Sequence, residues 1–284
     1  MPEPTGPQTK SQIRAVLDRA GSRPRHRFGQ NFMIEPDLVR RIADAGEVAE
    51  GDVVLEVGPG TGTLTGELLG RGAKVVAVEI DRDLAAALPE TFAGATEAGR
   101  LVVLETDALA GKHALAPPLA EAIRSAGRSK LVANLPYNIA SPLLVELLLV
   151  GVEVLAFTVQ KEVGDRLAAG PAAGKAYGPI GVIAQTLGDV ELLRTIGPGA
   201  FWPPPSIDSA LVRIRRKSSD QLKPLGDLRA FCQFTHDLFA QRRKALRGKL
   251  SAMNLMETAT ALGVDPSARV ETLDPATIAA LFQR

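Results

Sequence analysis

Residues 53–65 read VVLEVGPGTGTLT, an apolar run that passes directly into a loop with three glycines. Glycine permits a sharp turn and lets a ligand approach the backbone amides at the start of the following helix. Similar apolar runs recur, and segments with helical spacing lie between them. The runs span 74–80, 101–106, 130–134 and 154–160, and the helical segments span 61–70, 82–93, 115–126 and 140–149. This alternation predicts a parallel β-sheet covered by helices on both faces.

The flanking segments complete the predicted domain organisation. Residues 1–10 are polar and proline-rich, so we expect them to be disordered. Helices are expected over 11–20, from Pro36 onward and over 179–188, and two closing strands near 191–196 and 209–215. The polar segment 217–227 predicts a domain boundary. We therefore expect an α/β domain over 11–217 and a small helical domain over 218–284, whose last helix is capped by Asp274.

Composition excludes several classes of protein. The net charge of the 284 residues is +1, so any anionic partner must be met by local clusters of positive charge. The single cysteine, Cys232, and three scattered histidines cannot form a disulfide or a thiol-ligated metal cluster, and we predict no metal site. The start of the chain lacks a secretory pattern, and the apolar stretch 143–159 is interrupted by Glu146 and Glu153. We expect a cytoplasmic protein without a membrane partner.

Acidic residues at the strand ends indicate which ligand the glycine loop binds. The dinucleotide pattern G-x-G-x-x-G fails in both frames, because Thr63 and Thr65 stand where the third glycine belongs. Glu56, Glu79 and Asp107 lie at the ends of three predicted strands. Each acid alone is typical of a solvated strand terminus, but together they disfavour a pyrophosphate and favour a cation, by ~1–4 kcal/mol for a close pair. The cofactor predicted is S-adenosylmethionine, with Glu79 on its ribose and Asp107 on its adenine.

A second motif, Asn134-Leu135-Pro136-Tyr137, ends the fourth predicted strand at the same edge of the sheet. The Asn134 amide oxygen can accept a hydrogen bond from an amine, and Pro136 restricts Leu135 so that its carbonyl can also face the site. Two such acceptors draw an aromatic amine toward tetrahedral geometry without a titrating base. Tyr137 offers a ring on which an extruded base can stack, and Phe201 is the candidate for a second ring. For either ring alone, packing in the core is the simpler interpretation.

Eight stretches, taken in order, carry a family resemblance: HRFGQNFM (26–33), EVGPGTGTLT (56–65), VEIDRDL (78–84), TDAL (106–109), NLPYNIASPLL (134–144), VQKEVGDRL (159–167), YGPIGV (177–182) and FWPPPSIDSALVRI (201–214). Over about residues 22 to 250 the sequence resembles the ribosomal RNA adenine dimethyltransferase family, specifically its small-subunit branch. The resemblance implies a Rossmann-like class I methyltransferase fold with seven strands, mostly parallel and one antiparallel, and a helical C-terminal domain.

The resemblance also implies an activity and partners. The activity is dimethylation, with S-adenosylmethionine, of the N6 amines of two adjacent adenines in a hairpin near the 3′ end of small-subunit (16S) ribosomal RNA. The expected role is in small-subunit biogenesis, with the RNA or a 30S assembly intermediate as partner and the enzyme as a monomer. Cofactor contacts carry over to six residues: Asn31, Met33, Gly58, Glu79, Asp107 and Asn134. Base contacts carry over to Tyr137 and Phe201. The family has leucine where Met33 stands and a basic residue where Ser206 stands.

Basic residues form three runs: Arg23-Arg25-Arg27, Arg213-Arg215-Arg216-Lys217, and Arg242-Arg243-Lys244-Arg247-Lys249. We expect the last run to lie on one helix. Runs of charge are often solvated faces, but three of them at a net charge of +1 predict an RNA surface. The residues assigned to RNA contacts are Arg215, Arg242, Arg243, Lys244 and Arg247.

Other functions are compatible with parts of the sequence. A methylase of large-subunit RNA shares the expected pocket, and a protein glutamine methyltransferase needs a similar acceptor site. A ribosome-assembly or transcription factor can keep the fold without turnover, but Glu79, Asp107, Asn134 and Tyr137 are all present. A dinucleotide-dependent dehydrogenase is disfavoured, because both glycine frames fail.

Overall fold

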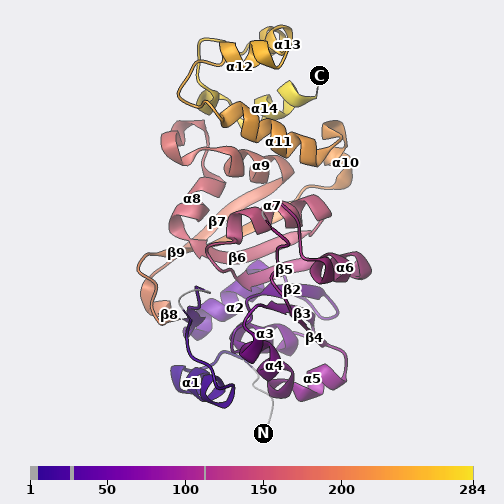
Figure 1. Cartoon of the computed structure of the whole chain (residues 1–284), viewed down its shortest axis with the longest axis vertical. Helices are drawn as coiled ribbons and strands as arrows, with labels where there is room; N and C mark the ends of the chain where they lie inside the picture. Colours follow the sequence, from indigo (N-terminus) through magenta and orange to yellow (C-terminus); the bar gives the residue numbers. More distant parts are fainter. Residues whose placement is uncertain (1–5, 26–28, 112, 284) are drawn as a thin grey trace. The chain divides into compact units, whose positions relative to one another are not determined.

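The structure, a computed structural model, describes residues 6–25, 29–111 and 113–283 (Figure 1). Its larger sheet has seven strands in the order β4-β3-β2-β5-β6-β9-β7. The strands are β2 (Val53–Val57), β3 (Lys74–Glu79), β4 (Leu101–Glu105), β5 (Lys130–Asn134), β6 (Val154–Gln160), β7 (Gly188–Ile196) and β9 (Ser209–Arg216). The four pairings from β4 across to β6 are all parallel. The predicted α/β architecture with a mostly parallel seven-stranded sheet is confirmed.

Helices follow the strands as the alternating pattern predicts. They are α2 (Pro36–Ala45), α3 (Thr63–Gly70), α4 (Arg82–Thr91), α5 (Ala93–Glu97), α6 (Pro117–Ala126), α7 (Ala140–Val150) and α8 (Lys161–Ala168). The helix predicted over 82–93 ends early, because Phe92 leaves helical geometry and is buried, and a separate short helix follows. The predicted apolar side of α2 is confirmed, since Leu38, Val39 and Ile42 are buried in the main core with residues of β2, β3 and β5.

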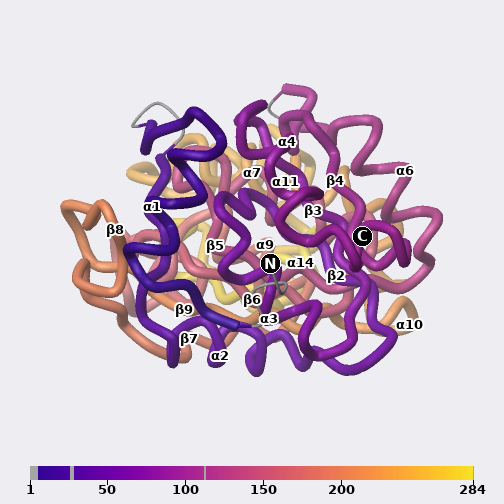
Figure 2. Tube along the Cα trace, turned by 90° about the horizontal axis from the view of Figure 1, so that it is seen from below, coloured from indigo at the N-terminus to yellow at the C-terminus, as the bar shows by residue number. Residues whose placement is uncertain are grey.

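The N-terminal segment forms a small substructure of its own. Helix α1 (Lys10–Arg19) packs with a two-stranded antiparallel sheet made of β1 (Phe32–Met33) and β8 (Phe201–Trp202). Figures 1 and 2 both place α1 beside β8. The expected disorder of residues 1–10 is wrong for residues 8–10, because Gln8 is buried and Thr9 caps α1. Residues 1–5 and 26–28 lie outside the described residues, so the predictions made for them, Arg27 included, do too.

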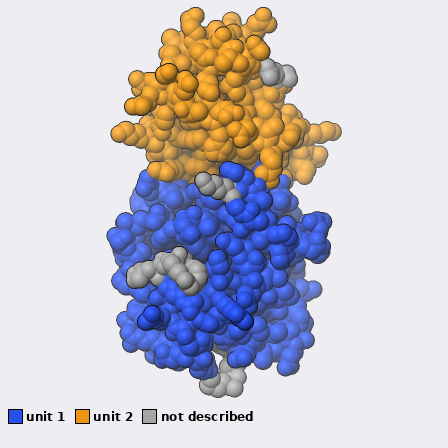
Figure 3. Space-filling view, in the orientation of Figure 1, with its two compact units in different colours: residues 1–164, 192–214 blue, residues 165–191, 215–284 orange. Residues whose placement is uncertain are grey.

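The chain divides into two compact units, residues 1–164 with 192–214 and residues 165–191 with 215–284 (Figure 3). The second unit is mainly helical: α9 (Pro179–Leu187), α10 (Ser219–Leu222), α11 (Leu228–Phe239), α12 (Arg247–Ala252), α13 (Met256–Ala261) and α14 (Pro275–Phe282). Short 3-10 helices are η2 (Pro171–Ala176), η3 (Pro198–Ala200), η4 (Lys223–Leu225) and η5 (Val270–Thr272).

The second unit therefore contains residues 165–191, which the sequence assigned to the first domain. Its helices explain the difference, since α9 packs against α11 and α14. The buried Tyr177 hydroxyl also donates a hydrogen bond to the Leu273 carbonyl at 2.8 Å. Asp274 caps α14, as predicted. Within the described ranges, no helix has the length and apolar character that crossing a membrane requires.

Candidate active site

The glycine loop connects β2 to α3 and can be built only from glycine at its turning points. Gly58, Gly60 and Gly62 have positive φ values of 73°, 59° and 85°, a region that other residues rarely adopt. A Cβ on Gly60 would lie 2.9 Å from the Phe32 ring, and one on Gly58 would lie 3.4 Å from the Pro136 ring. The loop therefore lies against both the N-terminal segment and the Asn-Leu-Pro-Tyr motif.

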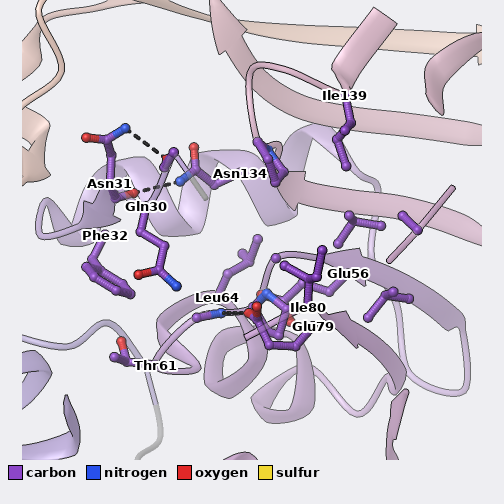
Figure 4. Close-up of a pocket in the computed structure, with 18 of the residues that line it drawn as sticks. Gln30, Asn31, Phe32, Glu56, Thr61, Leu64, Glu79, Ile80, Asn134 and Ile139 are labelled. Carbon is purple, nitrogen blue, oxygen red and sulfur yellow. Dashed lines mark hydrogen bonds between the residues drawn. The ribbon is translucent and has the colours of Figure 1, made fainter. Parts of the chain in front are cut away.

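Two buried acids lie beneath this loop. Glu56 is 2 % exposed and accepts a hydrogen bond from the Thr65 hydroxyl at 2.7 Å. Burial, together with the negative charge of nearby Glu79, raises the pKa of the Glu56 carboxyl to about 8. Both side chains line one cavity (Figure 4). The cavity thus holds a concentration of negative or protonatable groups, suited to a cationic ligand.

The third acid, Asp107, lines the same cavity from the end of β4. Its carboxylate accepts a hydrogen bond from the Leu109 backbone at 3.0 Å and is otherwise exposed. The Glu79 carboxylate accepts bonds from the backbone amides of Gly60 at 3.0 Å and Asp81 at 2.8 Å, while burial raises its pKa. Glu79 is therefore held in a fixed position below the glycine loop.

The N-terminal segment closes the cavity on the opposite side. The lining on this side consists of Gly29, Gln30, Asn31, Phe32 and Met33. Figure 4 labels Gln30, Asn31 and Phe32 among them. The buried Asp81 carboxylate accepts a hydrogen bond from the Gln30 amide at 2.9 Å and an ion pair from Arg25 at 2.9 Å. Because Asp81 also donates its backbone N–H to Glu79, the segment is tied to the acid beneath the glycine loop.

Asn134 joins this segment to the central strands. Its Nδ2 donates to the Asn31 carbonyl at 2.9 Å, and its Oδ1 accepts a hydrogen bond from the Thr158 hydroxyl. Asn134 and Thr158 are register partners on the parallel strands β5 and β6. The Leu135 N–H donates to the Thr158 carbonyl at 3.2 Å. The amide and the following peptide are thereby held in one orientation at the cavity edge.

Tyr137 lines a second cavity, next to the first. Its hydroxyl is 2.7 Å from the Ser209 Oγ, and burial raises its pKa. Gln160 and the proline-rich segment 203–207 also line this cavity. Gln30 and Asn31 line both cavities, so one short segment forms a wall of each. An aromatic ring, an amide and an apolar wall suit a flat heterocycle.

Phe201 lies elsewhere. Its side chain is 2 % exposed and packs in the main core with Met33 and Leu38, and its backbone pairs with Met33 in the small sheet. It is absent from the described residues that line either cavity. The structure therefore does not bring Phe201 to face Tyr137, and the core interpretation of this ring describes its position.

Two of the residues predicted to contact RNA have partners within the protein. Arg215 forms an ion pair with Glu191 at 2.5 Å. Arg242 pairs with Glu271 at 2.9 Å and donates to the Gly174 carbonyl at 3.1 Å. Both guanidinium groups therefore have a structural role.

The expectation that the last basic run lies on one helix is wrong. Helix α11 ends at Phe239, residues 241–246 form turns together with a single β-bridge from Ala245 to Arg269, and α12 begins at Arg247. Arg243 and Lys244 are exposed in the turns, and Arg247 is exposed at the start of α12. These three side chains are the predicted RNA contacts that remain open to solvent.

Several residues of the site were not assigned a role from the sequence. Gln30 and Gln160 line cavities, while Thr158 and Ser209 orient Asn134 and Tyr137. Strand register alone could have indicated Thr158, because a parallel alignment of the predicted strands places it beside Asn134. In the described part of the chain, no three His, Cys, Asp or Glu side chains are placed to hold a metal ion.

The comparisons agree on one family. The sequence model described as ribosomal RNA adenine dimethylase matches residues 21–284. The chain is 42 % identical to a protein named ribosomal RNA small subunit methyltransferase A from Nocardia farcinica, covering 94 % of this chain and 91 % of the relative. It is 39 % identical to a protein of the same name from Streptomyces coelicolor, covering 96 % of this chain and 94 % of the relative.

Two solved structures share the fold over most of the chain. The 23S rRNA methyltransferase ErmE superposes with a TM-score of 0.66 and is 25 % identical, covering 89 % of this chain and 98 % of its own. A dimethyladenosine transferase from Plasmodium falciparum superposes with a TM-score of 0.67 at 22 % identity, covering 88 % of this chain and 95 % of its own. The two show the same methyltransferase architecture.

Proposed function

Since this chain belongs to the ribosomal RNA adenine dimethylase family, we propose that it dimethylates the N6 amines of two adjacent adenines near the 3′ end of small-subunit ribosomal RNA. The relatives named for the small subunit are 39–42 % identical over at least 94 % of this chain, whereas the similar structure named for 23S RNA is 25 % identical. The enzyme is an S-adenosylmethionine-dependent rRNA adenine N6,N6-dimethyltransferase, and its place is in small-subunit biogenesis.

The first cavity fits S-adenosylmethionine by charge and by space. Glu79 and Asp107 supply acidic groups for a cationic ligand, and Glu56 and the glycine loop line the same cavity. The Thr61 hydroxyl lines the cavity, is buried, and has no hydrogen-bond partner among the described residues, which is the state of a group that a ligand completes. When bound, the cofactor supplies a methyl group carried by a positively charged sulfur.

Asn134 and Leu135 prepare the amine. Thr158 and Asn31 hold the Asn134 amide, and its Oδ1 keeps a lone pair for an N–H of the target adenine. The Leu135 carbonyl is the second acceptor. Together they draw the N6 nitrogen toward tetrahedral geometry, which localises its lone pair for transfer. Neither carbonyl oxygen is basic enough to take up a proton at neutral pH, so the proton lost from the amine passes to water.

The second cavity receives the extruded base. Flipping a base out of a helix costs a few kcal/mol, and stacking on Tyr137 returns ~1–3 kcal/mol. The prolines at 203–205 supply further apolar surface. Phe201 is buried in the main core, which gives no support to a second stacking ring.

RNA outside the cavities is held through phosphates. Arg243, Lys244 and Arg247 are exposed on the second unit, and residues 218–284 form its proposed RNA-binding part. The proposed partner is a small-subunit assembly intermediate, and the enzyme acts as a monomer in the cytoplasm.

The observation that carries this proposal is the orientation of Asn134, which lines the first cavity and donates to the carbonyl of Asn31, a residue that lines both cavities. Its test is incubation of the protein with labelled S-adenosylmethionine and unmodified small subunits, with unmodified large subunits in a parallel reaction. Label on two adjacent adenines near the 3′ end of small-subunit RNA is expected. Label confined to the large subunit would assign the chain to the other branch of the family, and no label would leave it as an assembly factor.

A further inference from the structure

An N-terminal residue outside the family match reaches the glycine loop. The family model begins at residue 21, yet the structure describes residues 6–20 as part of the first unit. Gln8 is 3 % exposed. Its Nε2 donates to the Thr61 carbonyl at 2.8 Å, and its Oε1 accepts a hydrogen bond from the Thr63 hydroxyl at 3.2 Å. One amide therefore bonds to both ends of the turn 61–63.

Backbone bonds also hold this turn, since the Gly62 N–H donates to the Pro59 carbonyl at 3.0 Å and the Gly66 N–H donates to the Gly62 carbonyl at 2.9 Å. Gln8 adds side-chain bonds to the residues on either side of Gly62. Gly62 is the N-cap of α3, has a φ of 85°, and offers no side chain to cap the helix. Glycine is the residue that loses most conformational freedom on folding, so a loop rich in it is costly to order. Thr61 and Thr63 both line the first cavity. A shift of this turn would therefore change the shape of the cavity wall.

Gln8 is itself held in place by the helix that follows it. Thr9 caps α1 in a capping box with Gln12. Helix α1 buries Ile13 and Leu17 against Phe32 and Leu84, and Trp202 packs on the same cluster. The charged groups of Lys10 and Arg14 lie over the Trp202 ring at 5.6 and 5.1 Å. Helix α1 is therefore packed against the first unit through Ile13 and Leu17, and Gln8, just before this helix, is bonded to the glycine loop.

We infer that Gln8 is a positioning residue for the cofactor, acting through the Thr61 carbonyl and the Thr63 hydroxyl. This inference rests on one part of the proposed function, namely that the first cavity binds S-adenosylmethionine. Gln8 orders the turn before the ligand arrives, so binding does not have to supply that ordering. Without Gln8 the turn loses both bonds, and ligand affinity falls while the reacting groups at Asn134 are unchanged.

The test compares Gln8→Met with Thr9→Ala in the full chain. Methionine keeps the length of Gln8 and removes both hydrogen bonds, whereas Thr9→Ala removes the adjacent helix cap and leaves Gln8 in place. Titration calorimetry with S-adenosylmethionine, in the absence of RNA, measures the dissociation constant of each protein. Thermal unfolding measures their stability, and turnover on unmodified small subunits gives kcat and KM.

We expect Gln8→Met to raise the Kd of the cofactor about tenfold, equivalent to about 1.4 kcal/mol, and its KM in parallel. The kcat at saturating cofactor and the KM for RNA stay at wild-type values. Thr9→Ala lowers the melting temperature with little change in Kd. An unchanged Kd for Gln8→Met, or an equal rise for Thr9→Ala, would overturn the inference. If the wild-type protein itself bound no S-adenosylmethionine, the proposed function would be at fault.

A second variant keeps the test open if Gln8→Met is poorly folded. Ionised Gln8→Glu can accept from Thr63 but cannot donate to Thr61, and uptake of a proton restores the donor. The ratio of its Kd to the wild-type Kd is therefore expected to fall as the pH is lowered. A ratio that is constant with pH while the variant stays folded would show that the bond to Thr61 has no influence on the cofactor.

Discussion

The Asn134 amide is held by one donor and one acceptor of the protein, from segments far apart in sequence. We expect Asn134→Ala to lower kcat by about 10²–10³-fold, in the range seen when one transition-state hydrogen bond is removed. RNA affinity changes little, because the amide acts on the amine and not on phosphates. Single-turnover methylation and filter binding of RNA separate the two effects, and wild-type turnover would refute the role.

Thr158 offers a milder test of the same geometry. Thr158→Val keeps the shape of the side chain and removes the hydroxyl that bonds to Asn134 Oδ1. We expect kcat to fall about fivefold, as suits one hydrogen bond of about 1 kcal/mol, with cofactor affinity unchanged. A fall in cofactor affinity without a change in kcat would move Thr158 from the reaction to the cofactor wall.

Glu56 makes the stability of the unliganded protein depend on pH. Burial raises the pKa of this carboxyl from 4.5 to about 8, so the folded state binds the proton more tightly than the unfolded state. The stability contributed by Glu56 is therefore full below the unfolded value and is lost as the pH rises toward 8. Urea unfolding at pH 5 and pH 8 is expected to show Glu56→Gln gaining stability relative to wild type at pH 8. Equal differences at both pH values would contradict this.

At the residue scale the sequence indicated the site well where one residue type defines the chemistry. Glu79, Asp107 and Asn134 all line the first cavity. The sequence could not separate Tyr137, at a cavity, from Phe201, in the core, because both are aromatic residues within two positions of a proline. Thr158 carried no local signal, since its role depends on the register between two strands.

Elements were predicted from periodicity, and most of the sheet strands lie within one or two residues of the predicted bounds. Strand β7 begins three residues before its predicted start at 191, and the strands that were not predicted are too short to show a period. Strands β1 and β8 have two residues each, and their pairing depends on contacts across the whole unit. The expected helix over the last basic run failed for a related reason, because helix propensity does not reveal that residues 241–246 turn.

The turn between α11 and α12 allows a matched pair of substitutions. Arg243 is exposed, whereas Arg242 pairs with Glu271. We expect Arg243→Ala to weaken RNA binding and to lower the slope of log affinity against log salt by about one, with the melting temperature unchanged. Arg242→Ala is expected to lower the melting temperature. Unchanged RNA affinity of Arg243→Ala at low salt would remove this turn from the interface.

At the scale of the whole molecule, the division into two units predicts that cofactor binding stabilises the first unit and not the second. Every residue that lines the first cavity belongs to the first unit. At 100 times its Kd, S-adenosylmethionine is expected to stabilise that unit by about 2.7 kcal/mol. Hydrogen exchange with and without cofactor should show added protection in β2 and β3 and little in α13. Equal protection throughout would mean that the two units unfold as one.

Local amino-acid composition indicated only one of the two places where the chain passes between the units. The polar segment at 217–227 is a plausible linker, and the sequence gives no comparable sign near residue 165. Residues 165–191 join the second unit because α9 buries its apolar side against α11 and α14, a long-range contact.

The wall shared by the two cavities has a consequence for repeated turnover. Gln30 and Asn31 line the first cavity on one side and the second cavity on the other. Two adenines that each gain two methyl groups consume four cofactor molecules, so spent cofactor must be exchanged between successive transfers. Whatever displaces this wall to release it also reshapes the nucleotide cavity. Thermodynamic linkage makes any such coupling reciprocal, so a nucleotide that changes the affinity for the cofactor has its own affinity changed by the same factor, and these two adjacent residues are placed to transmit it.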